Sequence, residues 1–160
     1  MFVADWEMQC CGKPFSVGAE VNWQLQFVHE DEVAAPSEVL LPADSAVTVP
    51  ATATAAADPD DLKGLRGALL ATWHGNRLQP PAEPVTGVVR RIRLVRQRAV
   101  QEESFLTVIP GRSHLTELTT SRDRFASGSM RTREDSWAET GLIVDLAVNL
   151  NDVIASVSGP

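Results

Sequence analysis

The chain has 160 residues, a formal net charge of −7, and 44% hydrophobic and 22% charged residues. This length and balance predict one soluble globular domain with its own core, and they exclude wholesale disorder. The negative charge argues against indiscriminate binding to nucleic acid or to an anionic membrane. With no leader-like segment and no apolar run of membrane-spanning length, we expect a cytoplasmic protein whose two cysteines remain thiols.

Charge is distributed unevenly along the chain. Residues 1–64 contain eleven acidic residues and two lysines, a net charge of −9, whereas residues 65–160 contain ten acidic residues and twelve arginines, a net charge of +2. Basic character is therefore local. Most of it lies in one segment, at Arg90, Arg91, Arg93, Arg96 and Arg98.

The N-terminal region predicts two strands joined by a tight connection. Phe2–Met8 alternates loosely between apolar and polar residues, and residues 19–27 alternate strictly, as a half-buried strand does. Gly12 and Pro14 interrupt the pattern between the two runs, and Gly18 suits a turn residue with positive φ. The strict alternation predicts that Trp23, Leu25 and Phe27 are buried while Asn22, Gln24 and Gln26 face water.

Residues 31–61 differ in composition from what precedes them. They are rich in Ala, Pro, Thr, Ser and Asp, which predicts a long, mostly irregular and flexible insertion. Asp58-Pro-Asp-Asp61 resembles the capped start of a short helix. We expect a single domain over residues 1–150 and a tail over 151–160.

Three segments after residue 61 predict strands. Gly67–His74 is expected to be the third strand of the fold, and Gly141–Leu150 a closing strand, with a short helix as its alternative. Residues 85–100 fit both a strand and a helix. Their β-branched residues and Gly87 favour a strand with a bulge.

Turn signals lie between these segments. Pro110-Gly111 separates two apolar runs, Phe105–Ile109 and Leu115–Thr119, and predicts a hairpin turn there. Residues 121–140 are polar and carry both signs of charge, which predicts a loop. Together the elements predict an all-β fold: a small antiparallel barrel, SH3-like or OB-like, with a long irregular insertion and at most short helices.

Cys10 and Cys11 are candidates for metal binding because thiolates are soft ligands for zinc and similar ions. Their adjacency argues against a shared ion, since neighbouring side chains of an extended backbone point in opposite directions. The simpler expectation is that one thiol packs inward and the other lies in a turn. A metal- or thiol-dependent site at this pair is the alternative.

The arginine-rich segment is the best candidate for binding. Arg90, Arg91 and Arg93 could hold a phosphate-bearing ligand, a single-stranded nucleic acid or an acidic protein. The competing interpretation is an edge strand whose charge deters edge-to-edge pairing and offsets the acidic first third. Residues 85–104 contain no aromatic residue with which to stack a base.

The four tryptophans fall into two groups. Trp6, Trp23 and Trp73 lie in strand patterns and are expected in the core. Trp137 lies in the predicted polar loop, where an exposed tryptophan could anchor a partner.

No enzyme motif stands out in the sequence. It contains no Gly-x-Ser-x-Gly elbow, no phosphate-binding glycine loop and no His-Glu-x-x-His. A cysteine could pair with His74 or His114, but no local pattern supports such a pair. We therefore expect a binding or interaction module without catalytic residues or a cofactor, with an enzyme of unrecognised class as the further alternative.

One stretch carries a family resemblance. Trp6-Glu-Met-Gln-Cys-Cys-Gly-Lys-Pro-Phe15, followed by Val17-Gly18, resembles the opening of a family of small uncharacterised actinobacterial proteins. The likeness is clearest over residues 4–23, and the arginine-rich, lysine-poor composition agrees with such an origin. The resemblance implies no activity and no catalytic residue.

Overall fold

The computed structural model describes residues 1–29, 46–48, 66–73, 84–102, 105–126 and 136–148. One short helix, α1, and seven strands occur within these ranges. In chain order the elements are β1 (Phe2–Ala4), α1 (Asp5–Cys10), β2 (Glu20–His29), β3 (Ala46–Thr48), β4 (Arg66–Thr72), β5 (Val85–Glu102), β6 (Phe105–Leu118) and β7 (Ser136–Val148).

Five of the strands close into a barrel, in the order β1, β7, β5, β2, β4 and back to β1. Four of the five contacts around the barrel are antiparallel, and the β1–β4 contact is parallel. β3 pairs with β4 at Arg66–Ala68, next to the residues that pair with β1, and β6 pairs with β5. The predicted all-β small barrel is confirmed, with a mixed rather than wholly antiparallel set of strands.

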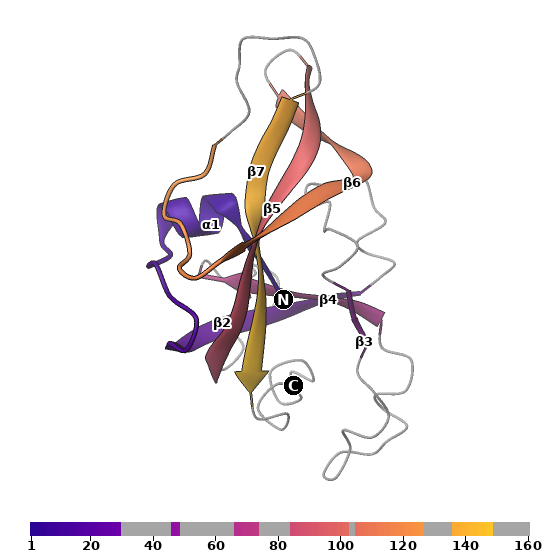
Figure 1. Cartoon of the computed structure of the whole chain (residues 1–160). Helices are drawn as coiled ribbons and strands as arrows, with labels where there is room; N and C mark the ends of the chain where they lie inside the picture. The colour runs from indigo at the N-terminus through magenta and orange to yellow at the C-terminus, as the bar shows by residue number, and fades with distance from the viewer. Residues whose placement is uncertain (30–45, 49–65, 74–83, 103–104, 127–135, 149–160) are drawn as a thin grey trace.

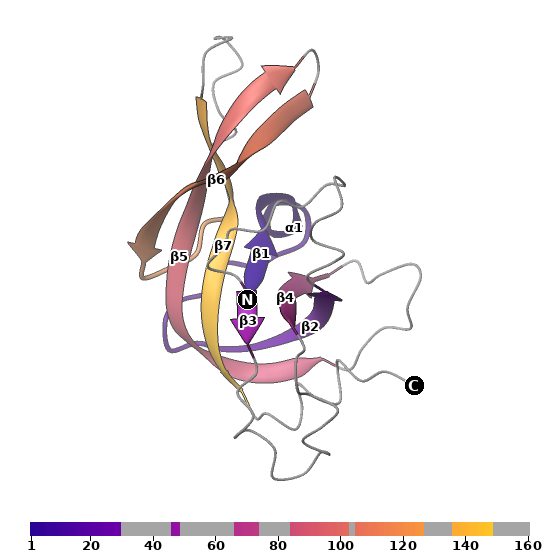
Figure 2. The same cartoon turned by 90° about the vertical axis from the view of Figure 1, so that its right-hand side faces the viewer.

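The long strands give the molecule its shape. β5, β6 and β7 rise together beyond the rest of the barrel, while β2 and β4 lie across their lower part (Figures 1 and 2). The core lies where these two groups meet, and its fully buried members include Val3, Val89, Ile92 and Leu142. The helix α1 lies beside the barrel next to β7.

The strictly alternating segment forms a strand, as predicted. Within β2, Trp23 and Leu25 are buried and Asn22 is exposed, whereas Gln24, expected to face water, is partly buried. The side chain of Phe27 lies outside the described part of the structure. Gly18 precedes the strand with φ of 87°, so the predicted turn glycine is also confirmed.

The prediction for Phe2–Met8 is wrong after its first three residues. Only Phe2–Ala4 is a strand, and Asp5–Cys10 is helical. Asp5 and Glu7 place acidic groups in the first turn, which suits the positive end of the helix dipole. Trp6, expected in the core, is 52% exposed because it lies on the outer side of this helix. A six-residue helix is too short to show a 3.6-residue period.

The segment 85–100 is a strand, β5, and the predicted bulge is present. The pairing of β5 with β7 shifts register between Val89 and Arg91 and again between Val95 and Arg96. β5 is long enough to contact β2 at one end and β6 at the other, with β7 along its opposite side. This position makes β5 a central strand of the described sheet rather than the edge strand considered for it.

The predicted hairpin at Pro110-Gly111 is wrong, because β6 runs through both residues. Gln97 faces Ser113 and Ala99 faces Val108, so residues 109–112 of β6 oppose a single residue of β5. This four-residue bulge accommodates the proline, which cannot donate a ladder hydrogen bond. The Pro-Gly pair therefore marks an irregularity within a strand.

The loop predicted over 121–140 is shorter than expected, since β7 begins at Ser136. Trp137 is therefore on a strand, and Gly141–Val148 is the predicted closing strand. Gly67–Thr72 is likewise the predicted third strand, as part of β4.

β3 lies inside the segment 31–61. The rest of that segment, the predicted helix start at Asp58 and the tail over 151–160 lie outside the described residues. In the described residues, no helix has the length and apolar character needed to cross a membrane.

Candidate functional site

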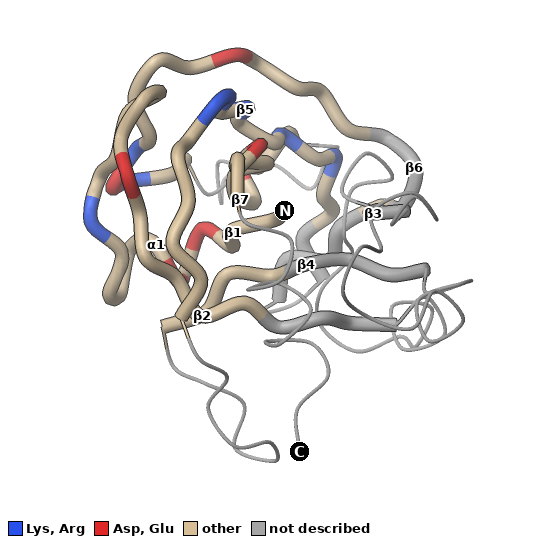
Figure 3. The backbone as a smooth tube through the Cα atoms, turned by 90° about the horizontal axis from the view of Figure 1, so that it is seen from below, with Lys and Arg blue, Asp and Glu red and all other residues tan. Residues whose placement is uncertain are grey.

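β5 carries an arginine stripe, made of Arg90, Arg91, Arg93, Arg96 and Arg98. Acidic residues of the neighbouring strands neutralise the middle of this stripe. Arg91 forms an ion pair with Glu117 of β6, and Arg93 Nη2 lies 2.8 Å from Asp145 Oδ1 of β7. The hydrogen bond to Glu117 raises the pKa of Arg91. Figure 3 shows the basic positions recurring along β5 with an acidic position on adjacent β7. Two of the three arginines selected from the sequence thus have acidic partners in the fold.

The upper part of β5 differs, because aromatic residues also lie beside its arginines. Arg96 faces His114 of β6 and Glu139 of β7, and Arg98 faces Trp137 of β7. The rings of His114 and Trp137 are 4.4 Å apart with an interplanar angle of 53°. Residues that face each other across a ladder share one side of the sheet. We call these four residues, Arg96, Arg98, His114 and Trp137, the ring patch.

The ring patch could not be read from local sequence. Its two arginines were visible in the stripe, but its aromatic residues come from the two strands that flank β5. The sequence predicts an exposed loop position for Trp137, whereas the structure places it partly buried on β7. Arg90 is exposed within the bulge of β5 and does not belong to the patch.

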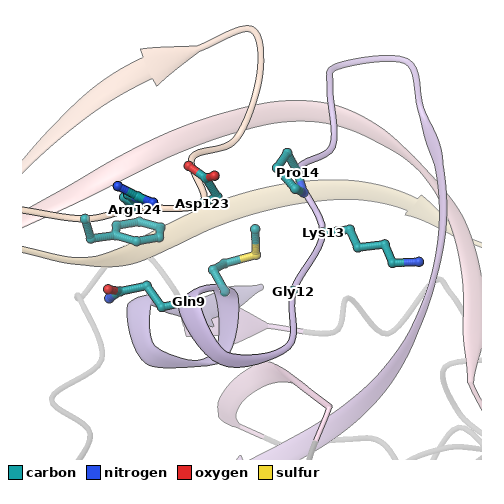
Figure 4. Close-up of a pocket in the computed structure, with 8 residues that line it drawn as sticks. Gln9, Gly12, Lys13, Pro14, Asp123 and Arg124 are labelled. Carbon is teal, nitrogen blue, oxygen red and sulfur yellow. The ribbon is translucent and has the colours of Figure 1, made fainter.

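A second feature is an open pocket of about 570 Å³ at the end of α1. Its base includes Met8 and Phe125, both buried. Gln9 and Gly12 lie on one side of it, and Asp123 and Arg124 lie across from them (Figure 4). Lys13 extends outward from the link that follows the helix. The rim therefore offers two cations, one carboxylate and one amide around an apolar base.

Hydrogen bonds join the two loops that form this pocket. The Phe15 N–H donates to Ser121 Oγ, and the Ser121 N–H donates to the Phe15 carbonyl oxygen, both at 2.8 Å. Buried Glu139 accepts hydrogen bonds from the Arg122 guanidinium and, at 2.8 Å, from the Ala126 N–H. These bonds fix residues 121–126 against β7 and the N-terminal link.

The helix itself is held by one buried carboxylate. Glu7 is 3% exposed, and its Oε1 accepts a hydrogen bond from Thr72 Oγ1 at 2.9 Å. Its Oε2 accepts a second from the Trp73 N–H at 3.1 Å. Because burial of an unsatisfied carboxylate would be costly, these bonds fix α1 against the end of β4. Glu7 therefore has a structural explanation.

The two cysteines lie where α1 ends, and the expectation of one inward thiol is wrong. Cys10 is the last helical residue and Cys11 the C-cap, with φ −140° and ψ −16°. Both side chains are exposed, and their Sγ atoms are 2.7 Å apart. The opposite orientation holds for extended backbone, and the backbone at the end of α1 is not extended. Among the described residues, no group of three or more His, Cys, Asp or Glu side chains is arranged to hold a metal ion.

The described geometry brings no cysteine to a histidine. The pocket at α1 is lined by neither residue type, and His114 lies against Trp137 on the far part of the sheet. The side chains of His29 and His74 lie outside the described part of the structure.

Fold and geometry thus define a small mixed β-barrel that carries a ring patch, a pocket and an exposed thiol pair. The chain belongs to a family of unknown function, DUF6578, whose model matches residues 1–148. No curated protein and no solved structure matches the chain. The predicted membership of a family without an assigned activity is confirmed, and the actinobacterial origin stays a prediction.

Proposed function

We propose that the protein is a cytoplasmic binding module without catalytic activity, and that the ring patch binds a ligand carrying both a phosphate and a flat ring. Nucleotides and single-stranded nucleic acids share this chemistry. The observation that carries the proposal is the pair of rings, His114 and Trp137, lying beside Arg96 and Arg98 on one side of the sheet.

The physical argument rests on two complementary contacts. Guanidinium groups make charge-assisted hydrogen bonds to phosphate oxygens, and aromatic side chains stack on bases without regard to sequence. Arg96 is exposed, and within the described residues it makes no ion pair. Arg91 and Arg93 are engaged by Glu117 and Asp145 and contribute less to binding. The ring pair favours a nucleotide over an acidic protein, which would need only the charges.

The test uses fluorescein-labelled oligothymidylate and, as a separate arm, a labelled mononucleotide, with binding followed by fluorescence anisotropy at low salt. Loss of one stacking ring in Trp137→Ala removes about 1–3 kcal/mol, so affinity should fall at least about fivefold. Trp137→Phe should restore most of that loss. Binding of the oligonucleotide alone identifies single strands as the ligand, and binding of both probes identifies the nucleotide unit.

Matched arginine variants supply the control. Arg96→Ala should weaken binding about fivefold, whereas Arg91→Ala, which removes an exposed pair with Glu117, should change it less than about twofold. Equal losses in both variants, or no binding of either probe by the unaltered protein, would refute the proposal. If the unaltered protein recovers an acidic protein, and both arginine variants lose it equally, the whole arginine stripe would be the binding surface for a protein partner.

A second candidate function is a soft-metal site at Cys10 and Cys11. The exposure of both thiols at one end of α1 favours it, because two accessible thiolates suit a soft ion such as Cu(I). Metal analysis of the purified protein should then find bound ion that is lost in Cys10→Ser. Metal-free protein with two reactive thiols would exclude this candidate.

A further inference from the structure

The thiol pair occupies a turn that the helix end imposes. The N–H groups of Cys11 and Gly12 both donate to the Glu7 carbonyl oxygen at 3.0 Å, so the backbone folds back on the last turn of α1. Glu7 is itself fixed to β4 through its side chain. The backbone that carries the two thiols is therefore held by the packing of α1 on the barrel, and the thiols remain open to solvent.

Gly12, which follows the two cysteines, limits how far the backbone of this turn can move. A Cβ built on Gly12 would lie 2.7 Å from Met8 Sδ and 2.8 Å from Met8 Cα, so the backbone is closely packed on the helix. Met8 and Gly12 both line the pocket at the end of α1. A covalent change at Cys10 and Cys11 would thus act directly on one wall of this pocket.

We propose that Cys10 and Cys11 form a thiol–disulfide exchange site that closes to a vicinal disulfide on reaction with a low-molecular-weight disulfide. One protein thiolate attacks a sulfur of the small disulfide, forming a mixed disulfide and releasing the first small thiolate. The second protein thiolate then attacks the protein sulfur of the mixed disulfide and releases the second small thiolate. The two cysteines lose two electrons and two protons, and the small disulfide is reduced to two thiols.

Proximity favours the second step. The resolving sulfur is already in contact with the attacked one, so ring closure needs no diffusional encounter. The hydrogen bond to Cys10 raises the pKa of the Cys11 thiol, in agreement with a proton held between the two sulfurs. Adjacent Cα atoms are about 3.8 Å apart, closer than the usual span of a disulfide, which makes the product easy to reduce. The exchange is therefore reversible.

To test this proposal, chelator-washed protein is treated with oxidised glutathione, and the intact mass of the protein is then measured under denaturing conditions. The unaltered chain should become lighter by two hydrogens and retain no glutathione, and dithiothreitol should restore the original mass. Cys10→Ser and Cys11→Ser, both at exposed positions, should each retain one glutathione because no resolving thiol remains. These matched variants show whether the first step occurs at both sulfurs.

Three results would overturn the proposal. They are retention of glutathione by the unaltered chain, a disulfide between two chains in peptide mapping, and no reaction at either thiol. None of these outcomes depends on the ring patch, so failure here leaves the nucleotide proposal standing.

Discussion

Gly141 is a position in β7 where a single added carbon should destabilise the barrel strongly. The residue lies on β7 opposite Ala4 of β1 and Val95 of β5, with φ of 151°. A Cβ at this position would overlap the Val3 carbonyl oxygen and lie 2.7 Å from Phe2 Cζ. Gly141→Ala must therefore displace β1, the strand that closes the barrel against β4.

The loss of stability in Gly141→Ala has two parts, backbone strain and displacement of β1. Substitution of a second glycine, Gly18, tests the first part alone. Backbone strain at such a φ is about 1–3 kcal/mol, and forcing β1 outward adds about 1–3 kcal/mol, so we expect a loss of about 4 kcal/mol in the free energy of unfolding. Gly18 has φ of 87° but open space around its Cβ direction. Gly18→Ala should lose only about 1 kcal/mol, since strain of about 1–2 kcal/mol is partly offset by a less flexible unfolded chain.

Thermal unfolding followed by circular dichroism measures both variants. For a chain of this size, 1 kcal/mol corresponds to about 2–4 °C in Tm. Gly18→Ala should lower Tm by about 3 °C and Gly141→Ala by more than about 8 °C. Equal shifts in the two variants would show that the contact between β1 and β7 carries no extra cost, and would refute the reasoning.

Three further predictions concern charges and thiols. Glu139→Gln should lower the free energy of unfolding by about 1–2 kcal/mol in urea titrations, because it weakens buried charge-assisted bonds, while exposed Glu117→Gln should change it by less than about 0.5 kcal/mol. Burial raises the pKa of Asp5, so this carboxyl binds more protons in the folded than in the unfolded state just above pH 3.8, and its contribution to stability falls as pH rises through that window. Asp5→Asn should remove this contribution from the pH dependence of the free energy of unfolding, and an unchanged pH dependence would contradict the prediction. Because the bond to Cys10 raises the Cys11 pKa, iodoacetamide should modify Cys11 faster in Cys10→Ser than in the unaltered chain at the same pH, as peptide mapping would show.

Hydrophobic periodicity was informative where one face of a strand packs on the core and the other faces solvent. The alternation over residues 19–27 predicted β2, with Trp23 and Leu25 buried, because the two sides of that strand meet different environments. The β-branched content of residues 85–100 likewise predicted β5. Both are properties of single segments, and they were sufficient for an all-β barrel.

Short or irregular elements were not predictable in the same way. Six helical residues at Asp5–Cys10 leave no period, and Pro110-Gly111 has the same local signature in a turn and in a bulge. Which of the two forms depends on the partner strand. β5 continues past the bulge, so β6 pairs with it again at Val108.

The sequence by itself determined the class of fold, the central strands and the positive-φ glycine before β2, because each follows from local burial pattern or backbone sterics. Only the tertiary structure decided which arginines are neutralised, since Glu117 and Asp145 are brought to Arg91 and Arg93 by strand register. It also decided that the Cys10 and Cys11 thiols point together, because that depends on where α1 ends. Contacts between segments distant in the chain arise from strand pairing and helix packing, and no single segment encodes them.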